Sequence, residues 1–369
     1  MERADERPSG GAPGSAASSD VPGEAGNPRR LLRQLLVTLL LTGVSLVLVV
    51  RWTGLLPQEL LGKLRPGWLA VAALALVFSW VVRSLRVWLL VRTLDEAPPF
   101  LALLTDFVSS LFVSGVTPTA SGGFPFFVYA LGRRGVGWGT ALAANVFDTV
   151  INVLTVAFLG VLAWILLLSY AAGRTGGVLL VGVAVWVVLG MAISIVSLLA
   201  PRPLAGWLYR VALRLRREGR RPRLTRLVHA SAGLAALHTR AVRKLRRRGR
   251  APLVYNFLLN LVYWVAFLSV SPLILAALGL VVKDGPGAPL WLDAIFAHLT
   301  YHLAQNAIPT PGAAGGAEVG IAYLFKPYLA ADRLGGFVLL WRLLTYYFQL
   351  AVGGLFLPRT LRQMIRGRA

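Results

Sequence analysis

The sequence predicts an all-α polytopic membrane protein with about six transmembrane helices and two re-entrant, broken-helix hairpins arranged as inverted repeats. Composition is the first reason. Of the 369 residues, 56% are hydrophobic and only 14% are charged, whereas soluble domains usually carry about 25% charged residues. The second reason is that the apolar residues fall in long runs. The third is that one Pro- and Gly-containing motif interrupts two of these runs.

The N-terminal residues 1–28 are rich in Gly, Ala, Ser, Pro and Glu and have almost no large apolar side chains. This composition is typical of a disordered tail. We expect an integral membrane domain over residues 29–360. Its first apolar run, 34–56, follows a cluster of Arg and has no small-residue cleavage site. We therefore interpret this run as an uncleaved helix and not as a signal peptide.

A helix needs about 20 mostly apolar residues to cross a bilayer. Six runs meet this requirement: 34–56, 68–92, 138–170, 175–200, 252–281 and 333–358. Two further apolar stretches, 101–131 and 291–326, are broken in the middle by Pro and Gly, and neither half of either stretch is long enough to span. We predict that these two stretches enter the membrane and return on the same side.

Residues 201–250 form a basic segment with sixteen Lys or Arg and a single acid, Glu218. At its start, Leu204, Trp207 and Val211 fall on one helical face, and Arg210 and Arg214 point away from it. This pattern predicts an amphipathic helix that lies on anionic lipid. The alternative is an ordinary solvated basic loop.

The basic residues also predict which side each loop faces. Lys and Arg concentrate in cytoplasmic loops. With both termini and 201–250 in the cytoplasm, the Lys and Arg of the loops and termini from residue 29 onward divide into 28 inside and 7 outside. We therefore expect a multi-pass protein of the cytoplasmic (inner) cell membrane with a cytoplasmic N-terminus and C-terminus. These loops account for the net charge of +23, so no nucleic-acid partner is expected.

The interrupting motif reads Thr-Pro-x-x-x-Gly-Gly and occurs twice, at 117–123 and at 310–316, an offset of 193 residues. Each copy lies between two predicted spans, which gives repeat one about 68–170 and repeat two about 252–358. In the orientation above, the first hairpin enters from the cytoplasm and the second from outside. Inverted repeats of this kind place the substrate site of many transporters near the membrane midplane.

The motif has a physical interpretation. Pro ends a helix, and paired Gly allows tight turns and close backbone approach. Backbone left unpaired at membrane depth must be buried in protein or line a wet cavity. The half-helices that begin near Phe124 and Ala317 would then point free N–H groups into the protein, where they attract anions such as phosphate. The alternative is a structural kink between packed helices.

Two charged residues fall in the middle of predicted spans. Asp148 and Arg342 each lie about ten residues into their helices, at a depth of about 15 Å in a core of about 30 Å. A charge at this depth normally faces a partner or a water-filled cavity. One interpretation is that Arg342 binds an anionic group of the transported molecule while Asp148 balances it. The other is that the two form a buried ion pair that holds the halves together.

Three further charged residues have two interpretations each. Glu318 follows the second Gly-Gly pair, where a carboxylate stabilises the helix dipole; proton or cation coupling is the alternative role. Arg83 and Arg86 lie toward the cytoplasmic end of 68–92, and we expect them to extend to the lipid headgroups. Capture of a cytoplasmic phosphate is the alternative for this pair.

His298, His302 and Asn306 recur at every fourth position and share one helical face. Two His at this spacing can bind a metal, but no acid accompanies them, so we favour a polar cavity lining. We expect Asn145, Asn256 and Asn260 to bond between helices. The chain has no Cys, no phosphate loop and no paired carboxylates at catalytic spacing. We therefore expect neither an enzyme nor a bound metal or cofactor.

Four motifs carry a family resemblance. They are Arg83-x-x-Arg86-x-Trp88, the first Thr-Pro-x-x-x-Gly-Gly followed by Val128-Tyr129, Pro309-Thr-Pro-Gly-Ala-Ala-Gly-Gly-Ala-Glu318, and Trp341-Arg342-Leu-Leu-Thr345-Tyr346-Tyr347. Together they resemble the lysylphosphatidylglycerol synthase transmembrane-region family over about residues 30–360. That family includes the flippase domain of the bacterial multiple peptide resistance factor. It would place an acid after the first Gly-Gly pair, where this chain has Phe124.

The resemblance implies a lipid translocase that moves an anionic phospholipid, an aminoacyl-lipid or a glycan-linked lipid. We expect the chain not to make lysyl lipid, because the soluble aminoacyl-transfer domain is missing. The alternatives are a membrane scaffold for a cytosolic glycosyltransferase or aminoacyl transferase, and a small-anion transporter. The expected substrate-binding residues are Arg342, Asp148, Glu318, Thr117, Pro118, Gly122, Gly123, Thr310, Pro311, Gly315, Gly316, Arg83, Arg86, Asn306 and Tyr346.

Overall fold

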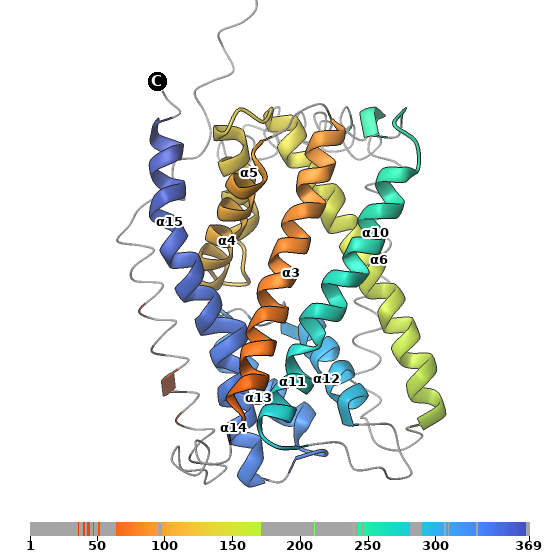
Figure 1. Cartoon of the computed structure of the whole chain (residues 1–369), viewed down its shortest axis with the longest axis vertical. Helices are drawn as coiled ribbons and strands as arrows, with labels where there is room; N and C mark the ends of the chain where they lie inside the picture. Colours follow the sequence, from red (N-terminus) through yellow and green to blue (C-terminus); the bar gives the residue numbers. More distant parts are fainter. Residues whose placement is uncertain are drawn as a thin grey trace, which may run out of the picture.

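The computed structural model describes residues 64–94, 98–170, 243–245, 247–280, 290–305, 308, 310–329 and 331–366, with a few single positions elsewhere. Within these residues the chain is helical apart from turns and one isolated β-bridge. Figure 1 shows a bundle whose helices run roughly along its long axis. The prediction of an all-α membrane protein is confirmed.

Four helical stretches of the described chain are long and apolar enough to cross a membrane. They agree with the predicted spans 68–92, 138–170, 252–281 and 333–358. The tail 1–28, the predicted spans 34–56 and 175–200, and the amphipathic helix of 201–250 lie outside the described ranges. The four stretches are α3 (Pro66–Thr93), α6 (Trp138–Tyr170), α10 (Ala251–Leu268) with α11 (Val270–Ala277), and α14 (Ala331–Arg342) with the π-helical segment η3 (Leu343–Phe348) and α15 (Gln349–Arg366).

The two interrupted stretches form two helical hairpins. The first joins α4 (Phe100–Val116) to α5 (Gly123–Arg133), and the second joins α12 (Leu290–Ala304) to α13 (Gly316–Phe325). At 1.5 Å per residue the longest of these helices is about 25 Å long and the shortest about 15 Å, less than the hydrocarbon core of about 30 Å. None of the four can therefore cross a bilayer alone.

The two hairpins enter the bundle from opposite ends (Figure 1). The first enters from the end that carries the C-terminus, at the top of the view, and the second enters from the bottom. The neighbouring spans are reversed in the same way: α3 runs upward and α6 downward, whereas α10 runs downward and α15 upward. This is the geometry that inverted repeats require.

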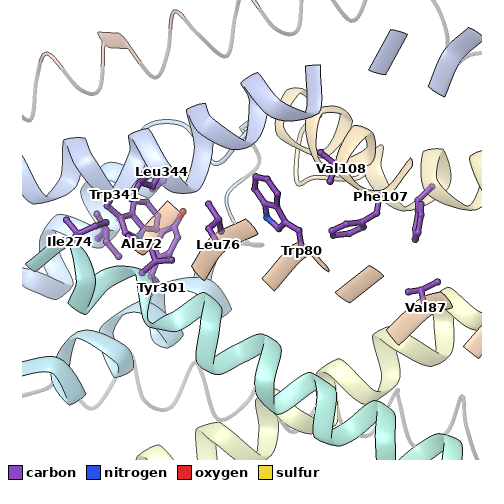
Figure 2. Packing of buried hydrophobic residues seen from close by; sticks show 14 of the residues in the cluster. Ala72, Leu76, Trp80, Val87, Phe107, Val108, Ile274, Tyr301, Trp341 and Leu344 are labelled. Atoms are coloured by element: carbon purple, nitrogen blue, oxygen red, sulfur yellow. The ribbon is translucent and has the colours of Figure 1, made fainter. Parts of the chain in front are cut away.

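Helix α3 is the axis of the hydrophobic core. Along it Ala72, Leu76 and Trp80 are buried at successive turns, and the cluster around them includes residues of both hairpins. Figure 2 shows Tyr301 and Trp341 near one end of this row and Phe107 near the other. One continuous apolar core therefore positions both hairpins.

Helix α15 packs closely against the first hairpin at Gly353. A Cβ at Gly353 would lie 2.8 Å from the Val108 carbonyl oxygen and 2.9 Å from the Phe112 Cβ. The absence of a side chain lets α15 pack directly on α4. The last span therefore holds the first hairpin at one end of the bundle and, through α14, contacts the second hairpin at the other.

Candidate functional site

The tips of the two hairpins meet, and Pro118 is exposed there while Pro311 is half-buried. Pro118 and Pro311 form an isolated antiparallel β-bridge, the one such bridge in the described chain. These two residues occupy equivalent positions in the two Thr-Pro-x-x-x-Gly-Gly motifs. The motif that ends each helix therefore also supplies the contact between the two hairpin tips.

Both tips adopt the same turn. Ser121 N donates to Pro118 O at 3.1 Å, and Ala314 N donates to Pro311 O at 3.1 Å. The two central residues of each turn have positive φ, at 52° and 55° in the first and 58° and 54° in the second, as in a type I′ turn. The four central residues are Thr119, Ala120, Gly312 and Ala313, and three of them are not Gly. Left-handed backbone at such residues is unfavourable and clusters at functional sites.

The Gly pairs that follow each turn are places of close approach. A Cβ at Gly123 would collide with the Ser114 hydroxyl, and one at Gly316 would lie 2.7 Å from Ile308 Cδ1. Gly122 N donates to Thr117 Oγ1 at 3.0 Å, so the motif Thr satisfies one backbone donor at the start of α5. The Gly residues therefore let each returning half-helix pack on the helix before it.

Arg342 and Glu318 form a buried ion pair beside the second tip. Arg342 Nε donates to Glu318 Oε1 at 2.6 Å, and the two residues are 2% and 0% exposed. Glu318 Oε2 accepts the Gly315 N–H at 2.8 Å, and Arg342 Nη1 donates to Gly312 O at 3.1 Å. Arg342 therefore joins α14 to the second tip and to the start of α13.

The guanidinium of Arg342 has one nitrogen, Nη2, that is not paired within the described chain, and we call the side of the group that it forms the free edge. This Nη2 is buried and has no hydrogen-bond partner among the described residues, and the same is true of Trp341 Nε1 beside it in the chain. The guanidinium lies over the Tyr346 ring, 4.6 Å from its centroid, and Tyr346 OH donates to Gly115 O of α4 at 3.3 Å. Buried donors are normally paired, and π-helical segments such as η3 frequently mark functional sites.

A second buried ion pair lies in the first repeat. Arg86 Nη2 is 2.6 Å from Asp148 Oδ1 and 3.3 Å from the Asp148 carbonyl oxygen. Arg86 also donates to the side-chain oxygens of Asn256 and Asn260, and Asn260 Nδ2 donates to Thr155 Oγ1 at 2.8 Å. Arg86 is 0% exposed, and each of its nitrogens has a partner. This pair fixes α3, α6 and α10 to one another.

Arg83 lies at the edge of this cluster. Its Nε is 3.7 Å from Asp148 Oδ2, its guanidinium lies 5.0 Å from the centroid of Phe107, and 39% of its side chain is exposed. The expectation that Arg86 extends to the headgroups is wrong, because its charge is fully enclosed by polar partners. Asn256 and Asn260 bond between helices as predicted, whereas Asn145 donates to Ala141 O within α6.

Of the two interpretations of Asp148 and Arg342, the ion pair between them is wrong. Asp148 faces α3 and pairs with Arg86, and Arg342 faces α13 and pairs with Glu318. Equal depth in two helices does not make two residues neighbours, because the face on which each lies decides its partner. Glu318 stabilises the start of its helix, so the anion position at the N-terminus of α13 is filled by a side chain of the protein.

His298 and His302 do not form a metal site with other ligands within the described residues. Ser271 Oγ and His298 Nδ1 are 3.0 Å apart, and Gln305 Nε2 and His302 Nδ1 are 2.6 Å apart. Within the described residues no three His, Asp or Glu side chains come together. Asn306 lies outside the described residues.

Sequence reasoning missed a third ion pair, between Asp106 and Arg134. We call the cluster around it the α15 clasp, which consists of Asp106, Ser109, Arg134, Thr360 and Gln363. Arg134 Nη2 donates to Asp106 Oδ1 at 2.8 Å and also to the Gln363 side chain, and the Ser109 and Thr360 hydroxyls are 3.0 Å apart. The clasp ties both helices of the first hairpin to the end of α15. Asp106 is the single acid of the stretch 101–131, and the argument applied to Asp148 would have found it.

Comparison with known proteins gives the family. The model of the lysylphosphatidylglycerol synthase TM region matches residues 34–353. A UPF0104 membrane protein of Archaeoglobus fulgidus is 27% identical over 309 residues, which cover 79% of this chain and 86% of that protein. No solved structure matches the chain significantly. Both hairpins and both buried ion pairs lie within the matched residues, and this chain belongs to the lysylphosphatidylglycerol synthase TM region family.

Proposed function

We propose that this protein is a lipid translocase that moves a lipid with an anionic headgroup across the cytoplasmic membrane. The observation that carries the proposal is the free guanidinium edge of Arg342 beside the meeting point of the two hairpin tips. Family membership supports a membrane role, and the geometry of the tips supports a site inside the membrane.

The hairpin geometry supports transport. Two broken helices that enter from opposite ends and meet at their tips are the arrangement in which many transporters hold their substrates. Backbone that leaves its helix at membrane depth needs protein or water around it. Here the two tips contact each other through Pro118 and Pro311. A movement of one repeat against the other would open the site to one end of the bundle and then to the other.

The chemistry of Arg342 supports an anionic headgroup. A guanidinium binds phosphate with paired, charge-assisted hydrogen bonds, and Nη2 is a buried donor that has no acceptor in the described chain. The basic segment 201–250, with its sixteen Lys or Arg, would gather anionic lipid at the inner leaflet, at about 1 kcal/mol for each basic residue near the surface. Such a site holds and moves a lipid without making or breaking a bond in it.

The test is a reconstituted system. Purified protein is placed in vesicles with a headgroup-labelled anionic lipid, and the fraction of label reached by a membrane-impermeant quencher is followed with time. We expect the wild type to equilibrate the label and Arg342→Ala to match protein-free vesicles. Arg359→Ala removes an exposed Arg of α15 and should behave as the wild type.

Three results would contradict the proposal. The first is a wild type that matches protein-free vesicles for every anionic and glycan-linked lipid tested. The second is an Arg342→Ala variant that moves lipid at the wild-type rate. The third is movement of inorganic phosphate but not of lipid, because the free Arg342 edge would also suit a small anion. Size-exclusion chromatography of each variant checks that the fold is intact.

A further inference from the structure

We propose that the Arg342 site takes up one proton with each anionic group that it binds, and that Glu318 is the proton acceptor. This inference rests on the proposed function and adds its energy source. It follows from the charge balance of the site, from the geometry of the guanidinium, and from the contrast with the other buried pair.

The first step is the charge balance. Arg342 and Glu318 are both buried, and together they carry no net charge. An anionic group entering beside them would leave one uncompensated negative charge in a low-dielectric interior, which is strongly unfavourable. A proton on Glu318 removes that charge, so Arg342 then balances the anion. The site is neutral before binding and neutral after it only if the proton and the anion arrive together.

The second step is geometry. Nε and Nη2 of an arginine lie on the same side of the guanidinium and form the edge that grips two oxygens of a phosphate or carboxylate. Glu318 Oε1 accepts from Nε at 2.6 Å, and Nη2 has no partner in the part of the chain that the structure describes. The edge is thus half-occupied by the carboxylate of the protein. A protonated Glu318 no longer competes for Nε, so both donors become available to one anionic group.

Glu318 has a second contact that survives protonation. Its Oε2 accepts the N–H of Gly315 at 2.8 Å, and the carbonyl oxygen of a neutral carboxyl group accepts such a bond as well. The start of α13 therefore stays capped while the charge of the side chain changes.

Among the described residues, Glu318 is the carboxylate that contacts Arg342. Helix α13 packs against α12 and α14. Among the described residues of these elements and of η3, the ionisable groups around the pair are Arg342 itself, Tyr301 on α12 and Tyr346 of η3. His298 on α12 lies farther from the pair: its ring contacts Trp341, and its Nδ1 is hydrogen-bonded to Ser271. Glu318 is the carboxylate in contact with the free edge.

The buried pair of the first repeat provides the contrast. Arg86 has partners on Nε, Nη1 and Nη2, drawn from two Asn side chains and from Asp148. It has no free edge, so an anion has nothing to bind there without breaking the cluster. Two buried pairs of the same charge in one bundle therefore differ in the feature that a binding site requires.

The experiment uses vesicles that contain the full chain and a fluorescent phosphatidylglycerol, with the membrane potential clamped at zero by valinomycin and equal potassium. A difference of one pH unit is imposed across the membrane, and the distribution of the label between the leaflets is measured at equilibrium. One proton for each anion predicts about a tenfold accumulation in the leaflet on the more alkaline side. Glu318→Gln, which keeps an acceptor for Gly315 N–H, should abolish the tenfold accumulation, whereas Arg359→Ala, at an exposed position of α15, should keep it. Protein-free vesicles give the background.

The outcomes separate the two proposals. A wild type that moves lipid but distributes it evenly under the pH gradient overturns the inference and leaves the proposed function standing. A Glu318→Gln variant that retains the tenfold accumulation also overturns it, because another group then carries the proton. A wild type that moves no lipid overturns both. If Glu318→Gln does not fold, the wild-type distribution under the gradient decides alone.

Discussion

Pro118 and Pro311, 193 residues apart in the chain, pair directly as an antiparallel β-bridge between the two hairpin tips. Directly opposite residues in antiparallel pairs have Cα atoms about 4.5 to 5.5 Å apart, which is within the range of a disulfide. If the two repeats move against each other during transport, this contact has to break in every cycle.

A disulfide across the tips should therefore stop transport. The chain contains no Cys, so Pro118→Cys combined with Pro311→Cys introduces the only two thiols. We expect mild oxidation to remove both thiols from reaction with a maleimide, to abolish lipid movement, and to do both reversibly upon reduction. Each single variant is the control and should be insensitive to oxidant. Full activity of the cross-linked protein would show that the tips stay together throughout the cycle.

The second tip should not tolerate a side chain at Gly312. Its φ is 58°, and a Cβ there would lie 2.7 Å from Cζ of the Tyr346 ring. We expect Gly312→Ala to lower the free energy of unfolding by about 1–3 kcal/mol, as overpacking usually does, and to lower the thermal midpoint in detergent. Gly67→Ala, at a helical position with nothing within 4 Å, is the matched control. Combining Gly312→Ala with Tyr346→Leu should recover part of the loss, and equal midpoints for the two glycine variants would contradict the clash.

The Arg86 cluster should be a determinant of stability. Removing one partner of a buried ion pair strands the other and costs about 3–5 kcal/mol. We expect Arg86→Ala and Asp148→Asn each to show a loss of this size in denaturant unfolding of the detergent-solubilised protein. Arg83→Ala should cost about 1 kcal/mol or less, since its charge is partly exposed and its contact with Asp148 is long. A double variant of Arg86 and Asp148 that is no worse than either single variant would agree with a shared cluster, whereas fully additive losses would not.

The two tips could be located from the sequence because their determinants are local. A Pro after a Thr and a Gly pair four residues after the Pro limit the backbone to a break and a tight turn wherever the motif stands. Two copies at a fixed offset then predict two equivalent turns. The structure shows that equivalence in the matching hydrogen bonds of Ala120 and Ala313, whose amides donate to Thr117 O and Thr310 O at 3.2 and 3.0 Å.

The partners of the buried charges could not be predicted in the same way. Depth follows from counting residues along a helix, but the partner of a charge depends on helix rotation and on which helices are neighbours. Asp148 and Arg342 are at similar depth and belong to different clusters. The free edge of Arg342 is a still finer feature, because it depends on a single carboxylate oxygen that accepts from Nε and leaves Nη2 without a partner among the described residues.

The α15 clasp should control access at one end of the bundle. Ser109 on α4 and Thr360 on α15 have hydroxyl oxygens 3.0 Å apart, so Ser109→Cys with Thr360→Cys should form a disulfide under mild oxidation. We expect this cross-link to block lipid movement while raising the thermal midpoint. The pair Asp106→Asn and Arg134→Gln removes the charges of the clasp and should speed the reaction of thiols placed in the first tip, such as Ser121→Cys. No change in thiol reactivity would mean that the clasp only stabilises the fold.

The orientation in the membrane can be read at two exposed positions at opposite ends of the bundle. Arg362 lies on the last turns of α15, and Pro327 follows α13. Because Lys and Arg accumulate in the cytoplasm, we expect Arg362→Cys in intact cells to resist a membrane-impermeant maleimide and to react after permeabilisation. Pro327→Cys should react in intact cells. The natural chain has no Cys, so the parent protein gives the background for both. The reverse pattern would show that the protein has the opposite orientation in the membrane. The first hairpin would then enter from the outside.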